Sequence, residues 1–231
     1  MEAPLIFAIE TSGKTGGLAL FKEKLIGEIT LSSKESYSTL IFKSLPFLEK
    51  LLNFSLKDID YYAIDIGPGS FTGLRIGLSI IKGFYLVFPK PIISICSLEI
   101  LATNFIGYPG TIITLIDAYS KEVFFASYEW KNFSLKTKIL PICISIKEIP
   151  NFVKTPSLFI SETLEKWDNF LKKSLNNLYL KPSVYPSITA GLLAKLAYLK
   201  LKEGTAEIKT AEELLPLYLK ASEAERKFLK I

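Results

Sequence analysis

The chain of 231 residues contains no histidine. This absence excludes Ser-His-Asp and Cys-His nucleophile systems, histidine general bases and zinc sites that use histidine. Glutamine is also absent, and methionine occurs once while lysine and glutamate are abundant. That profile fits a thermophilic source, although a biased genome would give a similar one. The two cysteines, Cys96 and Cys143, have no paired spacing, and Cys96 lies in an apolar run typical of a buried structural thiol.

Long uninterrupted apolar runs are missing too. Residues 74–95 form the longest apolar stretch, but it is interrupted by the charged residues and prolines Arg75, Lys82, Pro89, Lys90 and Pro91, and it is not expected to span a membrane. The N-terminus carries Glu2 instead of a basic segment, so we expect a cytoplasmic protein. The net charge of +5 comes from lysines spread along the chain, which permits an RNA-containing partner without indicating one.

The apolar patterning predicts an α/β protein with mixed sheets. In the first part we expect strands at residues 5–10, 18–21, 25–31, 61–66 and 92–96, with helices at 37–52 and 74–88. The pattern then restarts, with strands at 111–116, 122–130, 138–146 and 158–160 and helices at 97–105, 161–175, 187–202 and 221–230. Two tandem units of this kind predict two α/β subdomains joined without a flexible linker.

The most informative stretch is residues 67–77, which we call the signature loop; its sequence is Gly-Pro-Gly-Ser-Phe-Thr-Gly-Leu-Arg-Ile-Gly. It follows a predicted strand and leads into a predicted helix. Its glycines allow positive φ and close backbone approach, and Ser70 or Thr72 can cap the helix. Such a loop could bind an anion at the helix N-terminus, as many folds do. Glu10-Thr11-Ser12 resembles the Asp-Thr-Ser that begins chains of the actin/Hsp70/sugar-kinase superfamily, a resemblance that implies a hairpin facing the nucleotide phosphates. The possible nucleotide-proximal residues that follow from it are Glu10, Thr11 and Ser12, with Gly67, Pro68, Gly69, Ser70, Phe71, Thr72, Gly73 and Arg75 of the signature loop.

Residues 12–15, Ser-Gly-Lys-Thr, invite comparison with a P-loop. The motif also needs a glycine where this chain has Ala8, and it must open a helix, whereas a strand-like run follows Gly16 and Gly17. A strand–turn–strand hairpin is the better interpretation.

Three acidic residues, Glu10, Asp65 and Asp117, lie at or near predicted strand ends. If all three converged they could bind metal ions for phosphoryl chemistry. We favour the alternative of routine solvation or turn capping, because nothing in the spacing indicates that they meet.

Arg75 is one of two arginines in a lysine-rich chain, which favours a role for a planar, bidentate donor over an ordinary surface charge. The helix that follows carries small-residue pairs, Gly73 with Gly77 and Ser79 with Gly83, and looks apolar on more than one face. Together with the helix at 37–52 it is expected to bind a partner. The interface residues predicted are Leu40, Leu48, Leu74, Gly77, Leu78, Ile81 and Tyr85.

The signature loop resembles that of the TsaB (YeaZ) family, which acts in tRNA threonylcarbamoyladenosine synthesis. Four further segments are similar to that family: Phe-Ala-Ile-Glu-Thr-Ser at 7–12, Ser-Leu-Glu-Ile-Leu-Ala at 97–102, residues 116–124, and Leu-Pro-Leu-Tyr-Leu-Lys at 215–220. Departures are Glu10 where related folds have Asp, Tyr119 for the family's arginine, Phe124 for its tyrosine and Lys220 for its arginine.

This resemblance implies two RNase H-like subdomains of the actin-like ATPase superfamily, at residues 1–96, joined by the helix at 221–231, and at 97–220. It implies a non-catalytic scaffold with no catalytic residue and no metal site, pairing with TsaD, the threonylcarbamoyl transferase, and with the ATPase TsaE. The isolated protein would form a homodimer, would contact tRNA only through the complex and would need no cofactor of its own, with ATP or ADP and Mg²⁺ at the complex interface. Older names call the family glycoprotease-like. The alternatives are a small-molecule kinase or ATPase on the same fold, or a metal-dependent nuclease.

Overall fold

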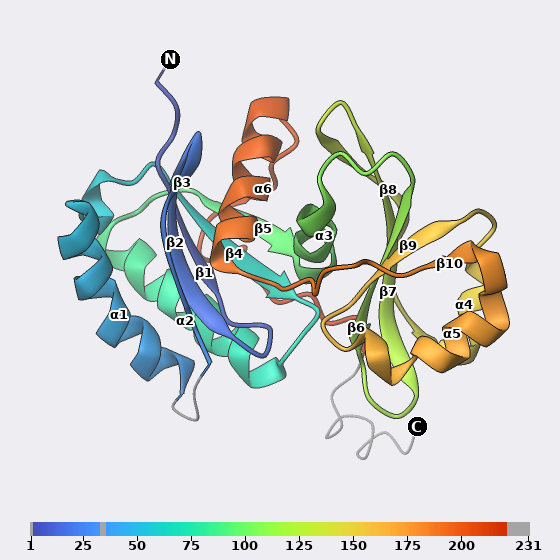
Figure 1. The fold of residues 1–231 in the computed structure, drawn as a ribbon. Coiled ribbons are helices and arrows are strands. Elements are labelled where there is room, and N and C mark those ends of the chain that lie inside the picture. The colour runs from blue at the N-terminus through green and yellow to red at the C-terminus, as the bar shows by residue number, and fades with distance from the viewer. Residues whose placement is uncertain (1, 33–35, 221–231) are drawn as a thin grey trace.

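Two mixed sheets with matching strand order form the framework of the computed structural model, which describes residues 2–32 and 36–220 (Figure 1). The first sheet has the order β11-β5-β4-β1-β2-β3 and the second β10-β9-β6-β7-β8. In each sheet the first three strands in chain order are antiparallel neighbours, and the next two pair in parallel on the other side of the first strand. The expected α/β class with two mixed sheets is confirmed.

The first lobe consists of the first sheet with α1, α2 and α6. Its elements are β1 (Ile6–Glu10), β2 (Gly16–Lys22), β3 (Lys24–Leu31), α1 (Tyr37–Leu52), β4 (Tyr61–Gly67), α2 (Phe71–Val87), β5 (Ile92–Cys96), α6 (Ala190–Glu203) and β11 (Ile208–Lys209). The α1 and α2 helices cover one face of this sheet and α6 covers the other (Figure 1).

The second lobe consists of the second sheet with α4 and α5 on its outer face (Figure 1). Its elements are β6 (Thr111–Asp117), β7 (Glu122–Lys131), β8 (Ser134–Ser145), α4 (Ile149–Phe152), β9 (Ser157–Ile160), α5 (Asp168–Leu175) and β10 (Tyr179–Leu180). The α3 helix (Ser97–Ala102) connects the lobes and contacts strands of both sheets.

Several predicted elements are confirmed with their bounds, such as the helix at 37–52 and the strand at 92–96. Strands β2 and β3 are joined by a tight turn at residues 22–24, where Lys22 pairs with Lys24. The helix expected to begin at Ser161 begins at Asp168, because residues 161–163 form a turn in which Ser161 Oγ accepts from the Thr163 N–H at 3.1 Å. The helix predicted at 221–230 lies outside the described residues.

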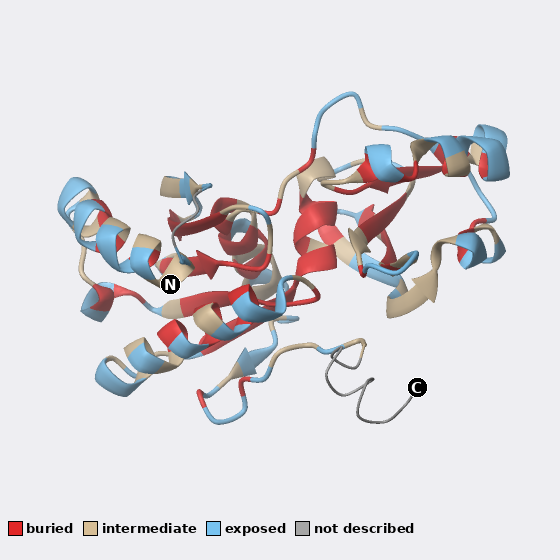
Figure 2. Ribbon diagram, turned by 90° about the horizontal axis from the view of Figure 1, so that it is seen from below, coloured by how far each residue is buried: buried red, intermediate tan, exposed pale blue. Residues whose placement is uncertain are grey.

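The buried residues form three clusters, two of which belong to single lobes. One fills the space between the first sheet and α1 and α2, and another lies between the second sheet and α4 and α5. The third is shared, because α3 and α6 pack between the inner faces of both sheets. Figure 2 shows buried residues in both lobes and at their junction, with exposed residues on the outer helices. This shared core holds the lobes in one arrangement.

The chain returns to the first lobe after completing the second. The α6 helix packs on β1, β2 and β3, and β11 pairs antiparallel with β5. The division of the chain into subdomains at residues 1–96 and 97–220 stays a prediction. That division assigned α6 and β11 to the second subdomain, whereas both pack on the first sheet. The segment 221–231 that was expected to join the first subdomain is not among the described residues. Within the described residues, no helix is long and apolar enough to cross a membrane.

Candidate functional site

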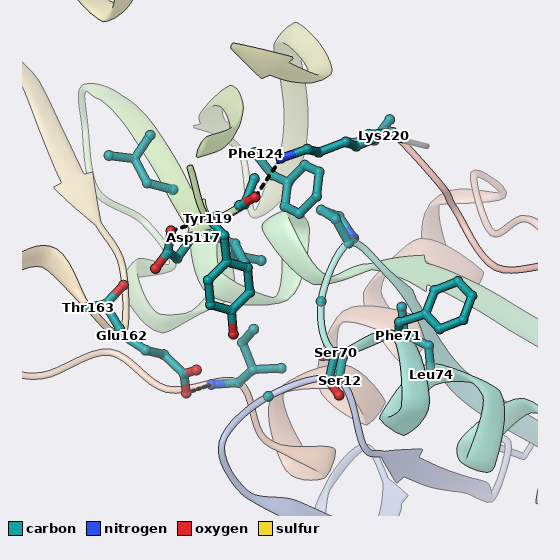
Figure 3. A pocket seen from close by; sticks show the side chains of 18 of the residues that line it. Ser12, Ser70, Phe71, Leu74, Asp117, Tyr119, Phe124, Glu162, Thr163 and Lys220 are labelled. Carbon is teal, nitrogen blue, oxygen red and sulfur yellow. Dashed lines mark hydrogen bonds between the residues drawn. The ribbon is translucent and has the colours of Figure 1, made fainter. Parts of the chain in front are cut away.

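A cleft of about 510 Å³ lies between the two lobes, and we call it the interlobe cleft. The first lobe contributes the β1–β2 turn and the signature loop, and the second contributes the β6–β7 turn and the segment after β9. These are the carboxyl ends of strands in both sheets, where ligands commonly bind in α/β proteins. Figure 3 shows Ser12, Ser70 and Phe71 on one wall, facing Asp117, Tyr119 and Glu162 on the other.

The signature loop links β4 to α2. Gly67 has a φ of 104°, a conformation that favours glycine, and Ser70 is the N-cap of α2, accepting from the Gly73 N–H at 3.2 Å. Of the two caps that the sequence offered, Ser70 and Thr72, the helix uses Ser70. The helix begins at Phe71 and ends at Val87, three residues earlier than the predicted start at Leu74 and one before the predicted end.

The other glycines of the loop accommodate this chain's own β1–β2 turn. A Cβ atom on Gly69 would lie 2.7 Å from the Ser12 carbonyl oxygen, and one on Gly77 would lie 2.4 Å from Thr11 Oγ1. Thr11 Oγ1 donates to the Gly73 carbonyl at 2.8 Å, and the Ser70 N–H donates to the Ser12 carbonyl at 2.8 Å. The close approach that these glycines permit is therefore one of chain to chain.

Residues 12–15 form a turn between two antiparallel strands, and Gly16 already belongs to β2. The hairpin interpretation is confirmed, and a P-loop is excluded because no helix follows. The Tyr37 hydroxyl donates to the Gly13 carbonyl at 2.9 Å, which ties the turn to the start of α1. Lys14 lines the interlobe cleft.

Two acidic side chains are buried behind the β1–β2 turn. Asp65 accepts from Ser12 Oγ at 2.6 Å, from Ser97 Oγ at 2.7 Å and from the Gly67 N–H at 2.7 Å. Glu10 Oε1 accepts from the Ser12 N–H at 2.5 Å, while Glu10 Oε2 is buried without a partner among the described residues.

Burial sets the protonation of this pair. It raises the pKa of Asp65 to about 6, against the hydrogen bonds from Ser12 and Ser97 that lower it. Burial, followed by the nearby Asp65 carboxylate, raises the pKa of Glu10 well above its ordinary value. The folded chain therefore holds the Glu10 proton to a higher pH than an exposed glutamate would.

The third acid near this pair is Glu162, which the sequence reasoning missed. Its carboxylate adds to the electrostatic field that raises the pKa of both Glu10 and Asp65, and it accepts from the Ile188 N–H at 3.2 Å. Asp117 instead pairs with Lys166 and accepts from the Tyr119 N–H at 2.9 Å. Across residues 2–32 and 36–220, no three acidic or cysteine side chains are placed to hold a metal ion. The spacing of strand ends could not reveal Glu162, because it lies in the turn after β9.

Arg75 contacts two aromatic residues that line the cleft, Phe71 and Tyr218. Its guanidinium carbon is 3.7 Å from the centre of the Phe71 ring, and its Nε donates to the Tyr218 hydroxyl at 3.1 Å. The Phe71 and Tyr218 rings are themselves stacked at 5.2 Å. The planar guanidinium is thus held in place from two sides.

The partner residues predicted on α1 and α2 need correction. Five of the seven, Leu48, Leu74, Gly77, Leu78 and Ile81, are buried within the first lobe, and Leu40 and Tyr85 are half-buried. Their apolar stripe faces the sheet, so these five cannot touch a partner. The exposed apolar side chains of the two helices are Phe42, Phe47, Leu51, Phe71, Leu86 and Val87.

A groove of about 800 Å³ runs between α1 and α2, and we call it the α1–α2 groove. Phe42 and Ser38 line it from α1, and α2 contributes an apolar and small-residue wall. That wall consists of Phe71, Thr72, Arg75, Ile76, Ser79, Ile80, Gly83 and Phe84. Phe71 and Thr72 also line the interlobe cleft, so the two cavities are neighbours.

Two lobes of the same topology around a central cleft define a protein of the actin-like ATPase fold class. A family model described as "TsaD: tRNA N6-adenosine threonylcarbamoyltransferase" matches residues 24–172. The chain belongs to this TsaD-like family, and relatives named TsaB support its assignment to the TsaB (YeaZ) family.

The relatives cover most of the chain. The tRNA threonylcarbamoyladenosine biosynthesis protein TsaB of Bacillus subtilis (strain 168) is 28% identical over 235 residues, covering 97% of this chain and 98% of the relative. The Escherichia coli (strain K12) protein of the same name is 32% identical over 130 residues, 54% of each chain. The solved structure "YeaZ from Pseudomonas aeruginosa" matches with a TM-score of 0.76 at 22% identity, covering 95% of this chain and 100% of that one.

Proposed function

We propose that the chain is a non-catalytic subunit of the machinery that makes N6-threonylcarbamoyladenosine in tRNA, where it binds and supports a TsaD transferase. Family membership and the relatives named TsaB support the pathway. The observation that carries the docking role is the α1–α2 groove, with an exposed glycine in the middle of one of its helices.

That glycine is Gly83. A glycine in the interior of a helix destabilises it by roughly 0.5–1 kcal/mol relative to alanine. Gly73 and Gly77 of the same helix compensate through close contact with Thr11, but a Cβ atom on Gly83 would meet nothing within 4 Å. The space beside Gly83 is thus unused within the described chain. A partner helix that packs closely against α2 would explain why glycine stands at position 83.

The exposed apolar residues support the same face. Phe42 and Phe47 on α1 are 56% and 61% exposed, and Leu86 and Val87 at the end of α2 are 81% and 68% exposed. Phe42 lines the groove, and the other three add exposed apolar side chains to the same two helices. Exposed apolar side chains gathered on one part of a protein are typical of a protein interaction site.

A catalytic role for the isolated chain has less support. Thr11 and Ser12 occupy the space beside Gly69, Gly73 and Gly77, so a phosphate has no room to approach these glycines closely. Glu162 lines the interlobe cleft, where its ionised carboxylate would repel an anion. We infer that this chain requires no cofactor of its own and that ATP or ADP and Mg²⁺ belong to the complex.

The partners follow from the same proposal. TsaD is the principal partner, and the ATPase TsaE joins the complex. When TsaD is absent, a second copy of the chain binds the same face. We expect tRNA to be contacted through the complex, so the affinity of the chain alone for tRNA should be weak and lost at high salt. Because the complex modifies tRNA, we place its work in the cytoplasm.

Reconstitution tests the proposal. The purified chain, the TsaD protein of the same organism, or both would be incubated with threonylcarbamoyl adenylate and unmodified tRNA, and modified adenosine would be measured. We expect no product with the chain alone and faster formation with both proteins than with TsaD alone. Product formed by the chain alone, or a TsaD rate that the chain leaves unchanged, would contradict the proposal.

A further inference from the structure

The turn between β7 and β8 places an aromatic side chain in an unfavourable backbone conformation. Lys131 pairs with Ser134, so the turn consists of Asn132 and Phe133, whose φ angles are 49° and 61°. A two-residue hairpin turn with positive φ at both positions favours asparagine followed by glycine. A bulky phenylalanine in the second position is a steric outlier, and it lowers the stability of the turn.

Packing does not offset this cost, because the Phe133 ring touches little of the described chain. The residue is 68% exposed, belongs to none of the three buried clusters and stacks on no other described aromatic ring. The turn itself is anchored, since Ser134 Oγ donates to Glu203 Oε2 at the end of α6 at 2.6 Å. The fold thus holds an apolar ring in solvent at the expense of stability, which is typical of a residue kept for a contact.

Three lysines of the same hairpin lie on one face of it, and we call them the hairpin lysines. Lys131 Nζ and Lys138 Nζ are each 3.4 Å from Glu129 Oε2, and Lys136 is the cross-strand neighbour of Glu129. Among the described side chains, Lys136 takes part in no ion pair. The opposite face, with Trp130, packs into the shared core. Three cations around a single carboxylate leave the exposed face of the hairpin positive.

We propose that this hairpin is an RNA contact of the complex, in which Phe133 stacks on an unpaired base of the tRNA and the hairpin lysines contact the flanking phosphates. The inference rests on the proposed function, which supplies tRNA as the substrate of the complex. An aromatic ring offers a stacking surface to any base, and lysines beside it follow the phosphate backbone. An acidic protein would suit the lysines but would leave the ring without a matching flat surface, whereas one nucleotide supplies both. A contact of this size leaves the isolated chain a weak binder.

Phe133→Asn tests the stacking. Asparagine tolerates a positive φ, so the substitution should raise the urea midpoint of the chain. The same variant should weaken the binding of unmodified tRNA to the complex with TsaD of the same organism by about tenfold, because it removes the stacking surface. Fluorescence anisotropy of labelled tRNA measures the affinity. In the modification assay the KM for tRNA should rise while kcat stays unchanged. A purely structural role of Phe133 would not combine higher stability with weaker binding.

Lys136→Glu tests the charge, and Lys173→Glu on α5 of the same lobe is its matched control, because both are exposed and make the same change in charge. Lys136→Glu should weaken tRNA binding about tenfold at low salt and reduce its salt dependence, with Lys173→Glu like the unaltered chain. Binding to TsaD in the absence of tRNA should be unchanged in all three variants, which circular dichroism checks for folding.

Full tRNA affinity in either Phe133→Asn or Lys136→Glu overturns the inference, as does an equal loss in Lys173→Glu. Weaker binding of Phe133→Asn to TsaD without tRNA also overturns it, because the hairpin would then meet a protein. Failure of the proposed function has a different readout, since the unaltered chain would leave the TsaD rate unchanged. The losses of tRNA affinity are measured on a complex in which the unaltered chain speeds TsaD, so they decide the inference alone.

Discussion

A Cβ atom on Gly73 would lie 2.0 Å from the carbonyl oxygen of Thr11. The first turn of α2 and the end of β1 are therefore in backbone contact, 62 residues apart in sequence, and the Thr11 side chain adds a hydrogen bond to the Gly73 carbonyl. Because the obstructing atom is backbone, it cannot rotate away. The glycine pattern of the signature loop is explained by this contact without any ligand.

Gly73→Ala should destabilise the fold by about 1–3 kcal/mol, the usual cost of overpacking a closely packed contact. Gly83→Ala is the matched control in the same helix, because a Cβ atom there meets nothing within 4 Å. It should stabilise the helix by about 0.5–1 kcal/mol. Urea unfolding of both variants measures the difference. Equal effects from the two substitutions would show that the contact with Thr11 is not what requires glycine.

The buried acids predict how stability depends on pH. The pKa of Asp65 is about 6 and that of Glu10 is also raised, both mainly by burial, so the folded chain holds these protons more tightly than the unfolded chain does. The contribution of this pair to stability should therefore be fully present below an unfolded carboxyl pKa of about 4, and should be lost as pH rises through about 6.

Glu10→Gln removes one of these titrations and keeps an oxygen to accept from the Ser12 N–H. It should flatten the fall in stability between pH 5 and 8, and raise stability at pH 8 relative to the unaltered chain. Glu212→Gln, at an exposed position, serves as control. Urea midpoints across this range give the result. A Gln variant with the full slope of the unaltered protein would show that Glu10 titrates normally.

The isolated protein should neither turn over ATP nor cleave RNA with Mg²⁺. Histidine chemistry is absent, and the loop that would hold phosphate is filled by Thr11 and Ser12. Assays with pure protein at high concentration measure both activities. Robust activity that disappears in Glu10→Ala or Asp65→Ala, with folding retained, would support the kinase or nuclease alternatives instead.

Local patterns predicted much of the fold. The apolar spacing of residues 37–52 gave a helix with the observed bounds, and Ser36 caps it by accepting from the Thr39 N–H. The positions of the helices relative to the sheets were harder to predict from the sequence. The spacing of residues 187–202 predicts a helix, but nothing in it tells which sheet α6 will cover.

In the candidate site, too, local features were predictable from the sequence and tertiary ones were not. Ser70 as a cap and the hairpin at residues 12–15 follow from local chemistry, and both were predicted. Four of the five partner residues chosen on α2 are buried, because the strongest apolar stripe of a helix faces its own core, as Leu78 and Ile81 show. The surface that remains for a partner lies off that stripe, at Gly83 and Leu86, where a glycine and an exposed leucine are weak signals in sequence alone.

The most direct measurement is TsaD binding by two variants that each replace an exposed phenylalanine. Phe42 lines the α1–α2 groove and is 56% exposed, whereas Phe133 is 68% exposed in the second lobe. Neither Phe42→Glu nor Phe133→Glu removes a buried core residue, so both should fold, which circular dichroism verifies. The account predicts that Phe42→Glu weakens binding to TsaD by a factor of about ten or more, by placing a charge in an apolar contact, while Phe133→Glu binds like the unaltered chain. Full binding by folded Phe42→Glu, or equal loss in both variants, would contradict the claim that this groove is the docking face.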